Sequence, residues 1–185
     1  MTVYRDAAHC IARVLSIETN DGTKKAGWQS KYEAPGWPEV KSAGSGLSSE
    51  ERLTQDSMTR ALLRRSLSPR QWHALVAKRS INDMEVAVSA QWLADNAAGP
   101  ASRRFKKCAI AAWIKPKRAA SQRSTRTLPD EFYAISSWDD DGRPEGTLRR
   151  WKSLTERWLN TQVSDAHNAV EQLLQDNGLK IDEAA

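Results

Sequence analysis

The chain has 185 residues, a formal net charge of +5 and 39% hydrophobic residues, enough for one folded domain with a sizeable core. No stretch approaches 18 apolar residues, and the N-terminus lacks a basic segment followed by an apolar run, so neither a membrane span nor an export signal is expected. Cys10 and Cys108 are isolated in the sequence, which disfavours a metal site or a disulfide scaffold. We therefore expect a cytoplasmic protein without a membrane partner.

Helical signals dominate and predict an all-α fold. The expected helices, in chain order, are residues 3–17, residues 48–66, one opened by Ser68-Pro69, one capped by Asn82-Asp83 and ended by Gly99-Pro100, residues 101–114, a short one at about 129–137, and one from about Pro144 to Asp176. A break in the last helix is expected near Ser164-Asp165. The predicted domain organisation is an N-terminal helix with an irregular loop (1–47), a helical DNA-binding domain (48–160) and a C-terminal helix with a tail (161–185).

The segment from Thr19 to Gly46 has no periodicity and predicts a long irregular N-terminal loop. It contains five Gly and two Pro, and its aromatic residues include Trp28 and Trp37. So long a connection is typical of a functional loop or of an extension that orders on a partner. Trp28 and Trp37 are therefore predicted partner-binding residues, since Trp is favoured at interfaces. The alternative is that both side chains pack on the core.

Basic residues are concentrated in one part of the chain. Between Asp95 and Asp130 there is no acidic residue, while nine of the 34 intervening residues are Lys or Arg. The rest of the chain has 19 basic and 23 acidic residues, a balance of −4. A local excess of this kind is typical of a polyanion-binding surface, because each Lys or Arg that neutralises a phosphate releases a counterion. The alternative is a solvated basic loop on an ordinary domain.

Two segments have the pattern of a helix-turn-helix. In the first, residues 67–113, the helix at 101–114 would be the recognition helix, with Phe105 and Trp113 on its apolar face. Ile110 and Ile114 are expected on its basic side. In the second, residues 129–158, the string around Trp151 would have that role, although the acidic turn before it would be repelled by phosphates. The predicted DNA-binding residues are Arg103, Arg104, Lys106, Lys107, Lys115, Lys117, Arg118, Arg149, Arg150, Lys152 and Arg157.

An enzymatic function has little support in the sequence. His9, His73 and His167 are scattered and match no metal-ligand spacing. A calcium loop that began at Asp139 would need a carboxylate at its twelfth position, where Arg150 stands. There is no Gly-rich phosphate loop and no nucleophile in a familiar motif. We expect a protein that is not an enzyme and that uses no cofactor or metal.

Three strings together resemble a known family. They are Ser-Pro-Arg-Gln-Trp-His-Ala-Leu from Ser68, Arg-Arg-Phe-Lys-Lys from Arg103 with the ending Trp113-Ile-Lys-Pro, and Trp138-Asp-Asp-Asp-Gly-Arg-Pro-Glu-Gly-Thr-Leu-Arg-Arg-Trp151. Over residues 60–160 the chain is similar to the phage Q-type transcription antitermination proteins and their relative AlpA. The long segment at 19–46 has no counterpart in this resemblance.

The resemblance implies a factor that binds double-stranded promoter-region DNA and loads onto a paused bacterial RNA polymerase with its sigma factor. It would then suppress pausing and termination. Other DNA-binding functions are a conventional activator or repressor and a phage packaging or excision protein. A different class is an RNA-binding or ribosome-associated protein that uses residues 96–129 as a basic arm.

Overall fold

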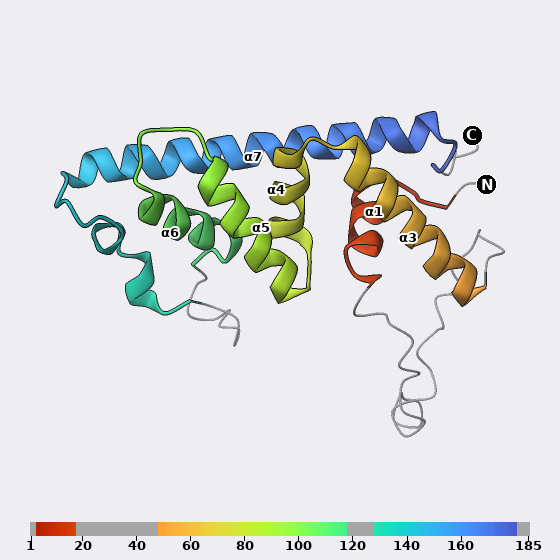
Figure 1. Ribbon diagram of the computed structural model, residues 1–185, viewed down its shortest axis with the longest axis horizontal. Coiled ribbons are helices and arrows are strands. Elements are labelled where there is room, and N and C mark those ends of the chain that lie inside the picture. Colours follow the sequence, from red (N-terminus) through yellow and green to blue (C-terminus); the bar gives the residue numbers. More distant parts are fainter. Residues whose placement is uncertain (1–2, 18–47, 118–127, 181–185) are drawn as a thin grey trace, which may run out of the picture. The chain divides into compact units, whose positions relative to one another are not determined.

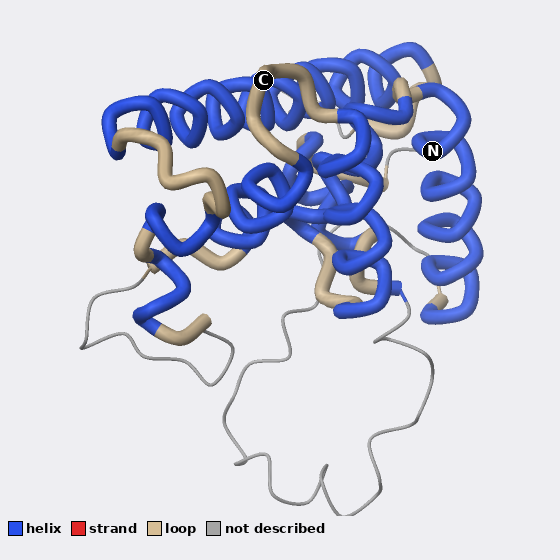
Figure 2. Tube along the Cα trace, turned by 60° about the vertical axis from the view of Figure 1, so that its left-hand side comes forward, coloured by secondary structure: helices blue, strands red, loops and turns tan. Residues whose placement is uncertain are grey.

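The computed structural model describes residues 3–17, 48–117 and 128–180, and within these ranges the fold is all-α, as predicted (Figure 1). Apart from helices, the described chain has one isolated bridge, between Tyr4 and Lys180, and no strand (Figure 2). The expected irregular segment at 19–46 lies outside the described residues. The helices are α1 (Ala7–Val14), α3 (Ser49–Ser66), α4 (Pro69–Arg79), α5 (Asp83–Asn96), α6 (Arg103–Ile114), the 3-10 helices η3 (Asp130–Tyr133) and η4 (Ile135–Trp138), and α7 (Glu145–Asp176).

The predicted helix starts at Ser68 and Asn82 are confirmed by their capping geometry. The Ser68 hydroxyl accepts from the Gln71 backbone N–H at 3.3 Å, and the Gln71 side chain accepts from the Ser68 N–H at 3.0 Å, which completes a capping box. The Asn82 side chain accepts from the N–H groups of Met84 and Glu85. These bonds satisfy backbone donors that the first turn of a helix leaves without an intrahelical partner.

Three expectations about helices are wrong. The helix expected at 3–17 is shorter, because Asp6 caps α1 and the N–H groups of Val3 and Tyr4 instead donate to the Leu179 carbonyl. The short helix expected at 129–137 is replaced by the two single-turn helices η3 and η4. The break expected near Ser164 does not occur, because Pro and Gly are absent between Thr147 and Asp176 and the apolar stripe continues through α7.

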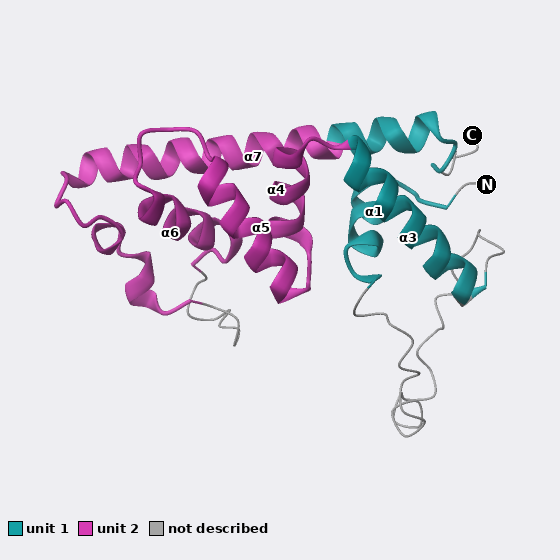
Figure 3. Cartoon of the chain, viewed as in Figure 1, with its two compact units in different colours: residues 1–66, 168–185 teal, residues 67–167 magenta. Residues whose placement is uncertain are grey.

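The chain forms two compact units (Figure 3). Unit 1 comprises Met1–Ser66 and Asn168–Ala185, and unit 2 comprises Leu67–His167. Helix α7 contributes residues 145–167 to unit 2 and residues 168–176 to unit 1. Among residues 3–17, 48–117 and 128–180, none of the helices combines the length and the apolar character that a bilayer span requires.

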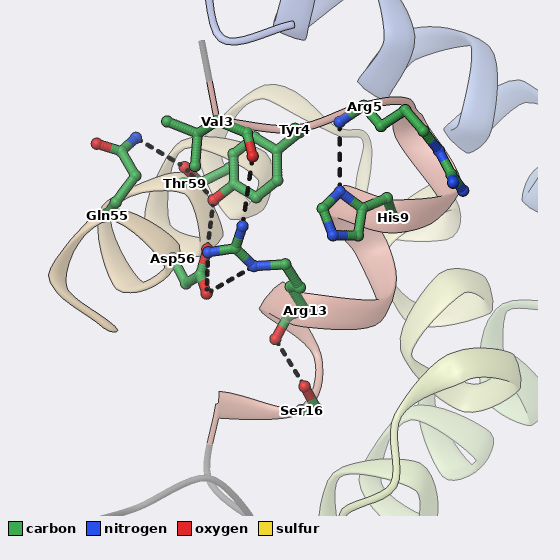
Figure 4. A network of polar contacts seen from close by, with 9 residues as sticks. All are labelled: Val3, Tyr4, Arg5, His9, Arg13, Ser16, Gln55, Asp56 and Thr59. Carbon is green, nitrogen blue, oxygen red and sulfur yellow. Dashed lines mark hydrogen bonds and ion pairs between the residues drawn. The ribbon is translucent and has the colours of Figure 1, made fainter. Parts of the chain in front are cut away.

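Unit 1 contains a buried polar network between the N-terminal segment, α1 and α3 (Figure 4). The Arg13 guanidinium donates to both Asp56 carboxylate oxygens, at 2.8 and 2.9 Å, and the Tyr4 hydroxyl donates to the same carboxylate at 2.6 Å. The Tyr4 hydroxyl also lies 3.1 Å from the Thr59 hydroxyl oxygen. Burial, and then the hydrogen bond to Asp56, raise the pKa of Tyr4 well above its usual value, so Tyr4 stays a neutral donor.

Unit 2 has two apolar clusters that share α6. The first joins α4, α5, α6 and α7 through residues such as Leu93, Ile110 and Leu159. The second joins α6 to η4 and the start of α7 through Phe105, Trp138 and other side chains. Ile110 belongs to the first cluster and is fully buried, although it lies close to Arg103 around the helix axis. Only a narrow strip of α6 is left for solvent.

Candidate nucleic-acid interface

The exposed strip of α6 carries four of the predicted cations of unit 2. Arg103, Arg104 and Lys107 are exposed, and Lys115, at the helix end, is half-buried. At 100° per residue these four side chains, together with Cys108, Ala111 and Ile114, occupy one side of the helix. Ile114 is thus on the basic side, as expected, and packs partly against the first cluster. The opposite side, which includes Phe105, is buried in the core. No carboxylate is present on α6 itself.

The two arginines at the start of α6 are paired with acidic residues from neighbouring elements. Arg103 Nε lies 2.5 Å from Asp95 Oδ1, at the end of α5, and Arg104 pairs with Asp140 in the turn before α7. The hydrogen bond from Arg103, and a further one from Gln91, lower the pKa of Asp95. Both pairs are well exposed to solvent, so each ion pair is little more stable than its two charged groups hydrated separately. Each arginine can therefore exchange its carboxylate for another anion.

The remaining cations of this segment have different environments. Lys106 is half-buried, and its ammonium group donates to the Ala97 carbonyl at 2.8 Å, so it braces the turn before α6. Lys117 lies 3.8 Å from Asp130 and 6.0 Å from the centre of the Tyr133 ring. In contrast, Lys107 has no ion-pair partner among the described residues. Of the predicted site residues, Arg118, Trp28 and Trp37 lie outside the described residues.

The second predicted set lies at the start of α7. Arg149 pairs with Glu145 at 2.6 Å, and Lys152 lies 3.7 Å from Glu156. Arg150 and Arg157 are exposed, seven residues apart, and neither pairs with a carboxylate of the described chain. These two arginines therefore form a short unneutralised stripe along α7.

The structure does not place Arg150 and Arg157 on the surface that α6 exposes. Leu148 and Leu159 of α7 pack in the clusters that contain α6. At 100° per residue, Arg150 and Arg157 lie on the side of α7 opposite these leucines. The α7 stripe thus faces away from the core that holds α6, and α6 and α7 offer two separate basic surfaces.

The first helix-turn-helix candidate has its expected three helices, whereas the second lacks its first helix. Helices α4 and α5 pack closely, as do α5 and α6. The Lys78 ammonium group of α4 donates to the Trp113 carbonyl at the end of α6, at 2.6 Å, and lies 4.5 Å above the Trp113 ring. Burial of Lys78 lowers its pKa. In the second candidate, η3 and η4 stand where the first helix would be. Of the two candidates, only residues 67–113 therefore form three successive α-helices, with α6 as the third.

Sequence reasoning missed the acidic partners of α6. Asp140 belongs to the turn that was expected to repel phosphates, and it pairs with Arg104, which precedes it by 36 residues. The other two acids of this turn pair with Arg143, at 2.7 Å for Asp139 and 2.5 Å for Asp141. The Arg143 backbone N–H, and then its side chain, lower the pKa of Asp139. The spacing of four residues between Asp139 and Arg143 could have indicated that pair. No nearby residue, however, indicates that Asp140 pairs with Arg104.

The described residues show no arrangement of side chains that indicates a metal site or a reactive cysteine. Among residues 3–17, 48–117 and 128–180, no three His, Cys, Asp or Glu side chains are arranged to hold a metal ion. Burial raises the pKa of the Cys10 thiol to about 12 and also raises that of Cys108, so both favour the unreactive protonated form. Comparisons with family models, curated proteins and solved structures give no match.

Proposed function

We propose that this protein binds double-stranded DNA and that α6 is the helix that enters the major groove. The observation that carries the proposal is the solvent-facing side of α6, which has four cations, no carboxylate, the small residues Cys108 and Ala111, and the half-buried Ile114. Recognition helices offer residues near their N-termini to base edges, while flanking cations contact phosphates. In this arrangement Arg103 and Arg104 exchange Asp95 and Asp140 for the nucleic acid.

The salt dependence of binding tests this assignment. Replacing Arg103 and Lys107 with Gln removes two cations from the α6 face, so the slope of log affinity against log salt should fall by about 2. The matched control is Arg5→Gln/Arg65→Gln, which removes the same charge from exposed positions of unit 1. Fluorescence anisotropy with a labelled duplex gives both slopes. Equal slopes for the two double variants would contradict a contact through α6.

The more specific proposal is a transcription antitermination factor that loads from promoter DNA onto bacterial RNA polymerase with its sigma factor. Its support is the resemblance over residues 60–160, together with the basic three-helix arrangement of α4 to α6. A reconstituted transcription assay with an intrinsic terminator downstream separates this function from its alternatives. We expect more transcript beyond the terminator at unchanged initiation. Increased initiation without readthrough would identify a conventional activator, and reduced initiation a repressor.

A competition experiment separates DNA binding from binding to RNA through a basic arm. We expect an unlabelled duplex to displace the labelled duplex at lower concentration than single-stranded RNA of the same sequence does. Preference for RNA, unaffected by the α6 substitutions, would instead favour the basic arm as the contact.

A further inference from the structure

The strongest unexplained feature of unit 2 is an apolar face on α5. Met84 is 74% exposed and Val88 is 61% exposed, and Ile81, just before the helix, is 44% exposed. Met84 and Val88 are four residues apart and therefore adjacent on one side of the helix. The other large exposed apolar residues of the described chain, Leu53, Met58 and Leu154, lie on other helices.

This face is not required by the core of unit 2. Helix α5 buries Ser89, Leu93 and Ala94. At 100° per residue, Met84 and Val88 are on the opposite side from Leu93. Isolated exposed apolar residues are common, but a contiguous group rimmed by polar residues is typical of an interaction site.

The charges on helix α5 itself have one sign. Helix α5 contains Asp83, Glu85 and Asp95 and no Lys or Arg. Asp83 and Glu85 flank Met84 on its two sides, and Asp95 lies on the same side of the helix three turns further on. Asp83 and Glu85 also stabilise the helix N-terminus. Glu85 is hydrogen-bonded to the Ser80 hydroxyl at 3.1 Å, and Asp95 is paired with Arg103. The result is an apolar centre with an acidic border in a unit whose neighbouring helix, α6, is basic.

We propose that the α5 face, defined by Met84 and Val88 with Asp83 and Glu85 at its border, is a docking surface for a protein segment that presents apolar residues flanked by Lys or Arg. An acidic border attracts such a segment and repels acidic ones. The same border disfavours a second copy of this chain in a symmetric contact, because each α5 would meet its own carboxylates across the twofold axis. The proposal is independent of DNA binding by α6.

A pair of synthetic amphipathic helical peptides tests the proposal with the full-length protein. One peptide has leucines along one face and lysines elsewhere, and the other has glutamates in place of the lysines. We expect the lysine peptide to bind in a fluorescence anisotropy titration, the glutamate peptide not to bind, and Met84→Gln/Val88→Gln to weaken binding at least about tenfold. The matched control, Leu53→Gln/Met58→Gln on α3, should leave the affinity unchanged. Asp83→Asn should weaken binding of the lysine peptide at low salt.

Several outcomes would overturn the proposal. Equal binding of the two peptides, or no effect of the α5 substitutions, would show that the α5 face is not the site. A wild-type dimer in sedimentation that the α5 substitutions dissociate would identify a second copy as the occupant. Loss of duplex binding by the α5 variant would place nucleic acid there instead. If the double variant has a lower Tm, Met84→Gln alone, at the more exposed position, serves for each measurement.

Discussion

Arg–Asp pairs occur in two regions of this protein in opposite environments. In unit 1, the side chains of Arg13 and Asp56 are only 24% and 12% exposed, and the carboxylate also accepts from Tyr4 (Figure 4). On α6, the side chains of Arg103 and Asp95 are 63% and 38% exposed. The same chemical pair therefore has two physical roles. The buried pair cannot separate without leaving a charge away from water, whereas the exposed pair exchanges readily with solvent or with another anion.

The largest expected effect comes from breaking the buried pair. Asp56→Ala should lower the free energy of unfolding by about 3 kcal/mol, because it leaves the Arg13 guanidinium and the Tyr4 hydroxyl without their shared acceptor. Chemical denaturation followed by circular dichroism measures the change. The matched substitution Asp95→Ala, which removes the partner of an exposed arginine, should leave the denaturation midpoint unchanged. Similar losses from both substitutions would show that burial does not distinguish the pairs.

A smaller effect is expected when the acidic partners of α6 are neutralised. If α6 binds DNA, Asp95→Asn/Asp140→Asn should tighten duplex binding by about fivefold at low salt, because two competing carboxylates near the phosphates are removed. The gain should shrink as salt is added, since exposed charges are screened. A matched variant, Asp165→Asn/Asp176→Asn on exposed positions of α7, controls for the change in net charge. A gain of the same size in the control would attribute the effect to net charge alone.

The smallest expected effect is a pH dependence that arises from two partly buried histidines, of which His9 is influenced by the charge of Arg13. Burial, and then the charge of Arg13, lower the pKa of His9 below its ordinary value of 6.5, and burial followed by Arg79 does the same for His167. The unfolded chain then binds more protons, so stability is retained above pH 6.5 and is lost as pH falls through the folded-state pKa values. Thermal unfolding between about pH 7.5 and 5.5 should show this loss, and His9→Gln/His167→Gln should reduce it. An unchanged pH profile in the double variant would assign the loss to other groups.

Much of the helical framework could be predicted from short stretches of sequence. Ser68 with Gln71, and Asn82 with the two N–H groups that follow Asp83, form their caps within three residues, so local sequence contains the whole interaction. The all-α fold follows from such signals and from apolar periodicity. Predictions failed where contacts between residues far apart in the sequence determine which side chains are buried. Ile110 looked misplaced on the basic side of its helix, but the cluster that α6 forms with α4, α5 and α7 buries it.

The candidate site could be predicted only in part, for the same reason. The sequence indicates that cations gather between Asp95 and Asp130, but it does not indicate which of them are paired. Asp140 is 36 residues from Arg104, and Asp56 is 43 residues from Arg13. Such pairs form only when tertiary packing places their helices side by side.

The sequence by itself determined where α4 and α5 begin, which residues carry charge, and that the basic residues cluster. Each of these depends on neighbours within about one helical turn or on residue type alone. Only the tertiary structure decided that Arg13 is buried against Asp56 while Arg103 stays in solvent, and that α6 and α7 expose their cations on different surfaces. Whether a side chain is buried, and which surface it reaches, depends on what packs against its helix. Most of those contacts join residues that are far apart in the chain.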